Sequence, residues 1–435
     1  MGLVLCPILS GGHSSNQSES HSYHLYSESH SYHLRSESSS SLSSQPSLPS
    51  VPSLSTPSGR LQQELITRPI HHQCIATLKG HSSYVFSLAL SRKFLYSGSS
   101  TSEIRAWNRD GHPSSSSVLD RPAPADNIVA TSNGAVKSLV VLGDKLFSAH
   151  QDNKIRVWKI EEENQGKQHQ SRYSCIATLP RMNDRLLRLF SAKNYVEVRR
   201  HKKCTWVHHV DTVSALAISK DASFLYSASW DRTFKVWRTS DFRCLESVEK
   251  AHDDAINALA LSGDGFVYTG SADKKIKVWK KLAGEKKHSL VATIEGHKSA
   301  VNALALSTDG SVLYSGACDR SILVWEKDDT SGGHMVLAGA LRGHRKAILC
   351  LAVVSDLICS GSADNTVRIW RRGSVEKSYS CLAVLEGHRR PVKCLTAAID
   401  SNNSTDDPDF CTSYLVYSGS LDCDIKIWHI QIPIL

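Results

Sequence analysis

The stretch Ser271–Trp279 reads SADKKIKVW, with an aspartate six residues before a tryptophan that closes a run of alternating polar and apolar residues. The same spelling returns along the chain as HQDNKIRVW (150–158), SWDRTFKVW (229–237), ACDRSILVW (317–325), SADNTVRIW (362–370) and SLDCDIKIW (420–428). A weaker first copy, STSEIRAW, ends at Trp107. Self-similarity of this kind predicts a repeat architecture, in which each copy is one small packing unit.

A second element precedes each of these copies except the one that ends at Trp158. It is a histidine followed four residues later by a β-branched residue: His81/Val85, His209/Val213, His252/Ile256, His297/Val301, His344/Ile348 and His388/Val392. Short alternating segments separated by Gly, Asp and Ser lie between the histidine and the tryptophan, and one more leads into the next histidine. Such segments at close spacing predict an all-β domain built from four-stranded units.

These units resemble the WD-repeat family, whose repeat opens in Gly-His and closes on a strand that contains tryptophan. The family's aspartate after the tryptophan is absent here, since Lys159, Arg238 and Lys280 stand at that position in three of the copies. The resemblance implies a seven-bladed β-propeller over residues 71–435. The segment 71–80 has the sequence of a fourth strand, so we expect it to complete blade seven and close the ring.

The resemblance also implies a hydrogen-bonded tetrad of His, Ser or Thr, Asp and Trp inside each regular blade. The expected tetrads are His209, Ser227, Asp231, Trp237; His252, Thr269, Asp273, Trp279; His297, Ser315, Asp319, Trp325; His344, Ser360, Asp364, Trp370; and His388, Ser418, Asp422, Trp428. The first two blades depart from this pattern. Thr101 replaces the aspartate in blade one, and Ser132 replaces the histidine in blade two, so we expect these two blades to be the least rigid.

Ser, His and Asp together also describe a hydrolase triad. A catalytic triad occurs once, in a cleft with an oxyanion hole, whereas this constellation recurs and is tied each time to a tryptophan. The sequence contains no nucleophile elbow, phosphate-binding loop, zinc-protease helix motif or dinucleotide fingerprint. We therefore expect no enzymatic activity, no cofactor and no metal site.

In WD-repeat propellers, the residues three and five places after the tetrad histidine and the residue before the aspartate point to the narrow top face that binds partners. The candidates at these positions are Tyr84, Phe86, Lys137, Gln151, Trp230, Asn257, Asn302, Leu349, Lys393 and Leu421. We interpret exposed Tyr84, Phe86 and Trp230 beside Leu349 and Leu421 as a protein-binding hot spot. The alternative is that these rings pack against neighbouring blades.

A basic insert at residues 180–206 separates blades two and three. It carries much of the chain's net charge of +9, and it includes Arg199 and Arg200. We expect it to emerge on the top face beside the aromatic positions and to attract an acidic segment of a partner. Alternatively, it is a structural flap held by its apolar residues Leu186, Leu187, Leu189 and Phe190.

Residues 1–70 form a Ser- and His-rich arm that cannot bury enough apolar surface to offset its conformational entropy, so we expect it to be disordered. No apolar run of the sequence is long enough to span a bilayer. The remaining charge is dispersed, which disfavours a nucleic-acid partner. We expect a monomeric propeller in the cytoplasm, and also in the nucleus because RRHKK (199–203) is a weak import signal.

The segments NYVEVRRHKK, HHVDTVSALAIS, LYSASWDR and CLESVEKAHDDAINALA look like the plant Jingubang-like WD-repeat group. That resemblance implies a non-catalytic regulatory scaffold in plant development, acting through protein partners such as transcriptional regulators. The alternative is a substrate receptor of a ubiquitin ligase. A lipid-binding propeller is a third hypothesis, but we expect no membrane partner.

Overall fold

The computed structural model describes residues 51–55, 70–109, 119–122, 127–162, 171–189, 195–199, 202–282, 284–328, 334–373, 378–400 and 411–433. Residues from Val51 to the C-terminus form one compact unit. The arm that we predicted to be disordered, residues 1–70, lies outside the described residues, apart from its segment 51–55 and Ile70.

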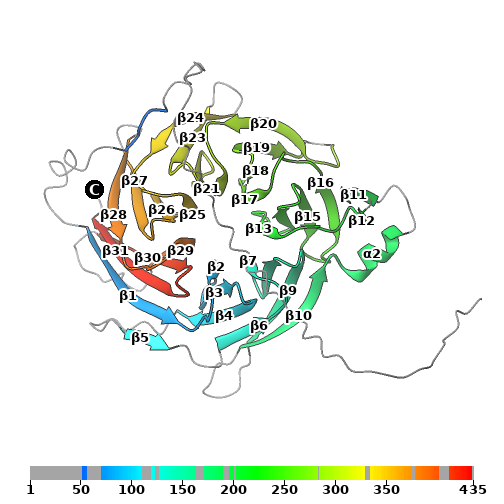
Figure 1. Ribbon diagram of the computed structural model, residues 1–435, viewed down its shortest axis with the longest axis horizontal. Coiled ribbons are helices and arrows are strands. Elements are labelled where there is room, and N and C mark those ends of the chain that lie inside the picture. Colours follow the sequence, from blue (N-terminus) through cyan, green and yellow to red (C-terminus); the bar gives the residue numbers. More distant parts are fainter. Residues whose placement is uncertain are drawn as a thin grey trace, which may run out of the picture. The chain divides into compact units, whose positions relative to one another are not determined.

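Seven antiparallel sheets are arranged in a ring, as the repeats predict (Figure 1). Blade one comprises β2 (Val85–Leu90), β3 (Phe94–Ser99), β4 (Glu103–Asn108) and β6 (Ile128–Thr131); blade two comprises β7 (Val136–Leu142), β8 (Lys145–His150), β9 (Ile155–Glu162) and β10 (Ser171–Leu179). Blade three comprises β13 (Val213–Ile218), β14 (Phe224–Ser229), β15 (Phe234–Arg238) and β16 (Cys244–Val248); blade four comprises β17 (Ile256–Leu261), β18 (Phe266–Ser271), β19 (Lys275–Lys280) and β20 (Ser289–Glu295).

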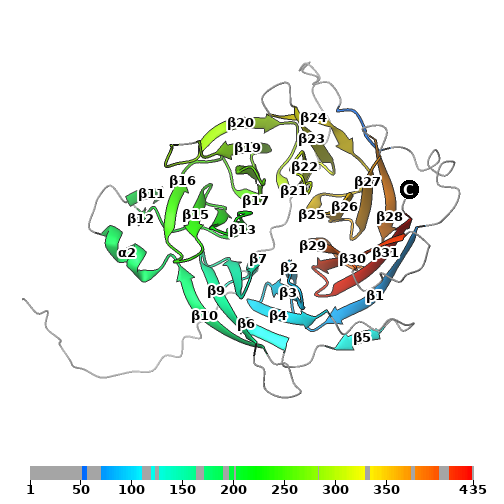
Figure 2. The same ribbon diagram turned by 180° about the vertical axis from the view of Figure 1, so that it is seen from behind.

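The remaining blades repeat this order from the centre outward. Blade five comprises β21 (Val301–Leu306), β22 (Val312–Ala317), β23 (Ile322–Asp328) and β24 (His334–Leu341); blade six comprises β25 (Ile348–Val354), β26 (Leu357–Ser362), β27 (Val367–Arg372) and β28 (Tyr379–Leu385). Blade seven comprises β29 (Val392–Ile399), β30 (Cys411–Ser420), β31 (Ile425–Pro433), β1 (His71–Lys79) and β5 (Leu119–Pro122). The innermost strands β2, β7, β13, β17, β21, β25 and β29 surround the central axis (Figure 2).

The second strand of a blade has a different burial pattern from the first. β2 alternates between buried and half-buried residues, because only one of its faces packs fully. β22 and β26 are buried along their whole length. A strand covered on both faces reads as a continuous run of apolar and small residues, which explains sequences such as VLYSGA.

The ring closes through the N-terminal strand, as predicted. β1 pairs antiparallel with β31 over seven residue pairs, from His71 opposite Gln431 to Leu78 opposite Ile425. β5, which the sequence analysis did not anticipate, pairs in parallel with β1. Blade seven thus joins the two ends of the described propeller, and its outer strand is covered by a fifth strand.

Neighbouring blades interlock through a small residue on one and a β-branched residue on the next. A Cβ atom on Gly316 of β22 would lie 2.5 Å from the Cγ2 atom of Ile348 in blade six. Gly98 and Gly419 meet Val136 and Val85 in the same way, at 2.5 and 2.8 Å from the Cγ1 atom. The β-branched residue four places after the histidine is therefore the wedge between adjacent blades, and the glycine makes room for it.

Residues 51–55 are bound to the outer edges of blades five and six. The N–H of Leu54 donates to the carbonyl of Ala340 at 2.9 Å, and the N–H of Tyr379 donates to the carbonyl of Leu54 at 3.0 Å. The Leu54 side chain occupies the space that a side chain on Gly339 would need. We predicted that the propeller begins at residue 71, but residues 51–55 are also bound to it. These five residues have no alternation of polar and apolar side chains that would have marked them in the sequence.

The basic insert contains α2 (Met182–Leu189) and a hairpin of β11 (Tyr195–Arg199) and β12 (Lys202–Thr205). Arg181 donates to the carbonyl of Asp241 at 2.9 Å, and the buried Asp184 carboxylate accepts from the N–H of Cys244 at 3.4 Å. These partners belong to the outer edge of blade three, and the insert lies at the rim of the ring (Figure 1). The expectation that it lies beside the central aromatic positions does not match this placement, because Arg181 and Asp184 are bonded to the turn before the outer strand β16 and to its first residue.

The interlock between blades predicts the cost of a single added methyl group. Gly316→Ala should lower the free energy of unfolding by about 1 to 3 kcal/mol, since the new Cβ overlaps Ile348 in a packed interface. Gly263→Ala is the matched control, because its Cβ would meet only the flexible Lys220 side chain, 3.3 Å away. Chemical denaturation of both variants measures the difference. Equal stabilities would contradict the interlock.

Candidate partner-binding face

One end of the ring carries two backbone positions that are paired in every blade. The N–H of the residue before the tetrad aspartate, or its equivalent, donates to the carbonyl three residues after the histidine position. The donors are Ser100, Gln151, Trp230, Ala272, Cys318, Ala363 and Leu421, and their respective acceptors are Tyr84, Ala135, Thr212, Ala255, Ala300, Ala347 and Pro391, at 2.9 to 3.0 Å. These are positions that the sequence analysis assigned to the top face, and we keep that name for this end of the ring.

The five predicted tetrads form hydrogen-bonded chains. In blade five, the Trp325 indole N–H donates to Ser315 Oγ at 2.8 Å, His297 Nε2 lies 2.7 Å from the same oxygen, and His297 Nδ1 lies 2.9 Å from Asp319 Oδ2. The other four have the same connections at 2.8 to 3.0 Å, in blades three, four, six and seven.

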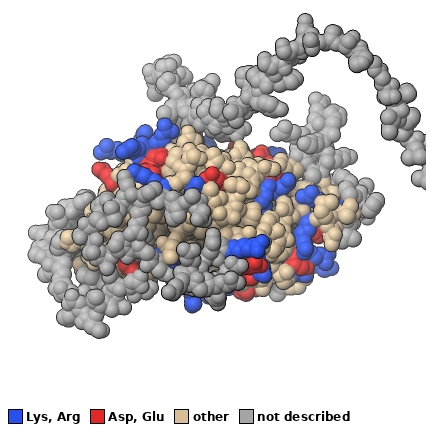
Figure 3. Space-filling model, turned by 90° about the horizontal axis from the view of Figure 1, so that it is seen from below, with Lys and Arg blue, Asp and Glu red and all other residues tan. Residues whose placement is uncertain are grey.

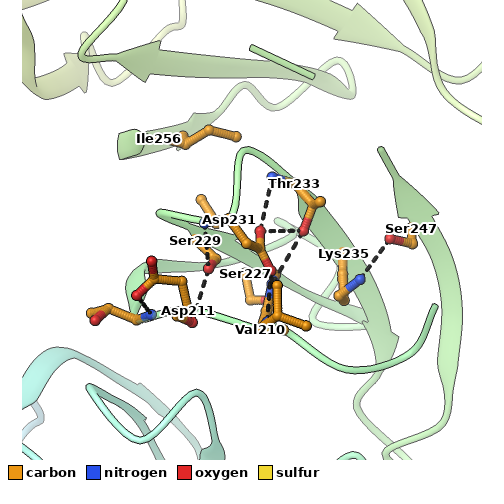
Figure 4. Close-up of polar contacts among 12 residues, drawn as sticks. Val210, Asp211, Ser227, Ser229, Asp231, Thr233, Lys235, Ser247 and Ile256 are labelled. Carbon is orange, nitrogen blue, oxygen red and sulfur yellow. Dashed lines mark hydrogen bonds and ion pairs between the residues drawn. The ribbon is translucent and has the colours of Figure 1, made fainter. Parts of the chain in front are cut away.

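The aspartate of each tetrad also holds two backbone segments. In blade three, Asp231 accepts from the N–H of Val210 and from the N–H of Thr233, both at 2.9 Å, and from the Thr233 hydroxyl at 2.6 Å (Figure 4). Val210 follows the tetrad histidine, and Thr233 precedes the tryptophan strand. The carboxylate therefore joins the loop and the turn that together make up the top face.

The protonation states follow from this geometry. Burial lowers the pKa of His209 and of His252 below the usual value, although the neighbouring aspartate opposes the shift. For Asp231, burial opposes ionisation, but the hydrogen bonds that it accepts from His209 and Thr233 hold its pKa well below the usual range. A neutral imidazole must then donate from Nδ1 to the carboxylate and accept at Nε2 from the hydroxyl.

This direction of bonding is also that of a catalytic triad, but the burial of the tetrad hydroxyl and its bond to the tryptophan argue against a nucleophilic role. Ser227 Oγ accepts from the indole N–H of Trp237 and donates its proton to His209. The serine is fully buried, and the tryptophan nearly so. A triad serine must instead present its oxygen to a substrate. The tetrads serve to position backbone.

Blade one departs from the tetrad as predicted. His81 Nε2 lies 2.7 Å from Ser97 Oγ, which also accepts from the Trp107 indole at 2.8 Å. The aspartate is missing, and His81 Nδ1 is buried without a hydrogen-bond partner among the described residues. Glu103 approaches only to 3.7 Å. Burial and the charge of Arg105 lower the pKa of His81 to about 3.

Blade two has a substitute histidine that the sequence analysis missed. His150 comes from the second strand instead of the preceding loop, and its Nε2 lies 2.7 Å from Ser148 Oγ, which accepts from the Trp158 indole at 2.8 Å. His150 Nδ1 lies 3.1 Å from Ser132 Oγ, the residue at the vacated loop position. The signal was available, since a histidine two residues before Asp152 occurs only in this copy.

Four predicted residues form a cluster at the centre of the top face. Tyr84 has 40% of its surface exposed, and its ring centroid lies 6.3 Å from that of Phe86. The ammonium of Lys137 lies 4.3 Å from the Phe86 centroid and 5.4 Å from that of Trp230. Cation–π contacts of this kind hold a lysine over aromatic faces and leave part of each ring accessible. Phe86 and Trp230 are half-buried, so Tyr84 offers the most surface.

The other predicted residues divide into three groups. Gln151 is exposed, and Lys393 and Leu421 are half-buried. Leu349 is only 9% exposed, so the expectation that it adds exposed apolar surface does not hold, because it points into packed structure. Arg200 lies outside the described residues, and nothing is described of the Arg199 side chain at the end of β11.

Asn257 and Asn302 make bonds between blades. Asn257 Nδ2 donates to the carbonyl of Val301 at 3.1 Å, and Asn302 Nδ2 donates to the carbonyl of Ile348 at 2.8 Å. Side-chain bonds also join each of the other pairs of adjacent blades. Ser87, Ser214, Cys350 and Cys394 donate to a carbonyl of the next blade, and Ser138 accepts from the N–H of Leu216. The two asparagines thus have a structural role at the position where we predicted partner contacts.

Charged side chains are dispersed over the side of the propeller that Figure 3 draws. On the side drawn in Figure 3, Lys and Arg side chains lie in separate groups among acidic and uncharged residues. No helix in the described ranges has the length and apolarity to cross a bilayer. The described residues also contain no group of three or more His, Cys, Asp or Glu side chains arranged to hold a metal ion.

Comparison with protein families identifies the repeat. The model of the WD40 family, described as "WD domain, G-beta repeat", matches residues 72–108, 201–238, 242–280, 288–326, 335–371 and 379–429, which together exceed half of the chain. The chain belongs to the WD40-repeat family. The matches omit blade two, where the histidine has moved from the loop to the second strand. The WD40 fold thus has seven blades here, and the family model matches six of them in sequence.

Individual relatives are distant and diverse. Autophagy-related protein 16 of Arabidopsis thaliana is 27% identical over 291 residues, covering 63% of this chain and 54% of that protein. The CCR4-associated factor 4 homolog of Candida glabrata is 28% identical over 193 residues, which is 42% of this chain and 32% of that protein. Telomerase protein component 1 of Rattus norvegicus is 22% identical over 300 residues, 66% of this chain but 11% of that protein. The chain spans between about a tenth and about half of the length of such relatives.

The uncharged buried histidines predict a dependence of stability on pH. Burial lowers the pKa of His150 from 6.5 to about 4, so between these values the unfolded chain binds a proton that the folded chain does not. The stability that this residue contributes is complete above pH 6.5 and is lost as the pH falls toward 4. Between about pH 7.5 and about pH 5.5 the loss should be about 1 kcal/mol from this residue alone.

Denaturation of the His150→Gln variant at both pH values measures this contribution. The variant should be less stable than the parent near neutral pH but should lose less stability on acidification. His334→Gln is the control, because His334 is exposed and its replacement should leave the pH dependence unchanged. The same pH dependence in the parent and in His150→Gln would contradict the assignment.

Proposed function

We propose that this WD40 protein is a non-catalytic regulatory adaptor that holds partner proteins on the top face of its propeller. One observation carries the proposal: the cluster of Tyr84, Phe86, Lys137 and Trp230, which is supplied by three adjacent blades and remains accessible at the centre of that face. Accessible aromatic rings on a rigid backbone are favoured anchors in protein interfaces, because they bury much area at a small entropic cost.

Backbone hydrogen bonds at the cluster support this proposal, even though blade one lacks the tetrad aspartate. Tyr84 and Trp230 lie at the backbone positions that are hydrogen-bonded in every blade, and Trp230 directly precedes the tetrad residue Asp231. A partner would therefore meet a surface that needs little reorganisation, which reduces the entropic cost of association. Gln151 and Leu421 occupy equivalent positions in blades two and seven and would extend the contact.

The finer biological assignment rests on resemblance. The likeness to the plant Jingubang-like WD-repeat group supports a role in plant development, in the cytoplasm and the nucleus, with transcriptional regulators as partners. Arabidopsis thaliana proteins occur among the relatives, which is consistent with a plant setting. We expect the propeller to act as a monomer.

Proximity labelling with the full chain tests the proposal. The variant Tyr84→Ala/Trp230→Ala should lose a defined set of labelled proteins, because the apolar anchor is gone. Leu245→Ala/Leu290→Ala is the matched control, since these exposed side chains lie on outer strands β16 and β20, and it should retain that set. Thermal melting verifies that each variant is folded.

The identity of the lost proteins distinguishes the two candidate roles. Transcriptional regulators among them would support the regulatory adaptor, whereas cullin-type ligase components would support a substrate receptor instead. If a folded Tyr84→Ala/Trp230→Ala variant labels the same proteins as the parent, partner binding does not use this face and the proposal fails.

A further inference from the structure

Basic side chains are concentrated on one half of the top face. In blades five, six and seven, the loop after the tetrad histidine carries exposed cations, and the turn of blade five adds another. These residues, which we call the basic arc, are Lys298, Arg320, Arg345, Lys346, Arg389 and Arg390. The arc is separate from the basic insert at the rim of blade three.

The tetrads fix the position of the arc. The N–H groups of Lys298, Arg345 and Arg389 donate to Oδ2 of Asp319, Asp364 and Asp422 at 2.9, 2.8 and 2.9 Å. Each residue follows its tetrad histidine directly, so the three backbones occupy equivalent places in successive blades. The cations therefore follow the curve of the ring at one height on one face.

Few acidic side chains counter this charge. Among the described residues, no carboxylate forms an ion pair with an arc side chain, and Glu295 at the edge of blade four pairs with Lys275 at 3.0 Å. The exposed Glu386 and the half-buried Asp424 also lie at this end of blades six and seven. The tetrad aspartates lie beneath the loops in five blades alike, so they do not distinguish this half from the other.

The opposite half of the face has acidic residues at the equivalent positions. Asp211 in blade three and Asp253 and Asp254 in blade four occupy the loops that hold Lys and Arg in blades five to seven, and all three are exposed. The exposed cations Arg232 and Lys274 in the adjacent turns offset them only in part. The top face is thus basic on one side and mixed to acidic on the other.

We propose that the basic arc binds an acidic, extended segment of a partner protein. This inference rests on the proposed use of the top face and names the chemistry of the partner. Guanidinium groups pair well with carboxylates, and unpaired cations on a rigid curve attract such a segment over a Debye length of about 8 Å. A long nucleic acid fits less well, because its phosphates would continue from the arc onto Asp211, Asp253 and Asp254.

The basic arc and the aromatic cluster would make different kinds of contact with a partner. The cluster lies on blades one to three and offers apolar contact, whereas the arc lies on blades five to seven and offers charge. A partner with an apolar anchor followed by an acidic stretch would contact both across the centre of the ring. The charged contact would act chiefly on the association rate and on partner choice.

Fluorescence anisotropy with the full chain tests the inference, using a labelled synthetic Glu/Ser peptide as the probe. The parent should bind the peptide with an affinity that falls as salt is added. Arg345→Glu/Arg389→Glu should weaken binding by about tenfold or more at low salt. Arg232→Glu/Lys274→Glu reverses the same number of charges at the same end of the ring, and it should bind within about twofold of the parent.

Two results would overturn the inference. One is equal peptide binding by the parent and a folded Arg345→Glu/Arg389→Glu variant. The other is tighter binding of single-stranded DNA than of the peptide, which would assign the arc to nucleic acid. The Tyr84→Ala/Trp230→Ala variant should bind the peptide like the parent, so failure of the arc and failure of the proposed adaptor face are separate outcomes.

Discussion

The structure depends on one chain of buried hydrogen bonds, from an indole through a hydroxyl and an imidazole to a carboxylate. In blade five it runs from Trp325 through Ser315 and His297 to Asp319. Each of these groups would cost about 1 to 3 kcal/mol if it were buried without a partner. The hydrogen-bond chain links the third strand of the blade to the top-face loop, so the same bonds that hold a blade together also fix the surface that partners would meet.

The ring imposes a second constraint, because every blade must fit between two neighbours. The β-branched residue after the histidine, such as Ile348, occupies the space left by a glycine of the preceding blade, such as Gly316. Side chains such as Asn302 then add a hydrogen bond across the same interface. Residues that look like candidates for binding can therefore be needed for assembly, and exposure separates Tyr84 from Asn302 and Leu349.

The repeats made much of this predictable. A tetrad needs a Ser or Thr, an Asp and a Trp at a fixed spacing, with a His before them. The five regular tetrads, the number of blades and the closing strand β1 could therefore be inferred from the sequence alone. The features that could not be inferred depend on contacts that do not recur from blade to blade. Leu54 is held by backbone pairing with Ala340 and Tyr379, and α2 is held by the outer edge of blade three through Asp184. In blade two, His150 of the second strand replaces the missing loop histidine, and a search for histidine at the usual loop position overlooks it.

The direction of the hydrogen-bond chain is the central claim, and the tautomers of His209 and His252 test it most directly. Magnetic resonance of isotope-labelled imidazole nitrogens, assigned through His209→Gln and His252→Gln, reports which nitrogen carries the proton. Near neutral pH, we expect both rings to be neutral and protonated on Nδ1, donating to Asp231 and Asp273. Rings that are charged, or protonated on Nε2 alone, would contradict the account, because Nε2 would then donate to the tetrad hydroxyl and could not accept from it.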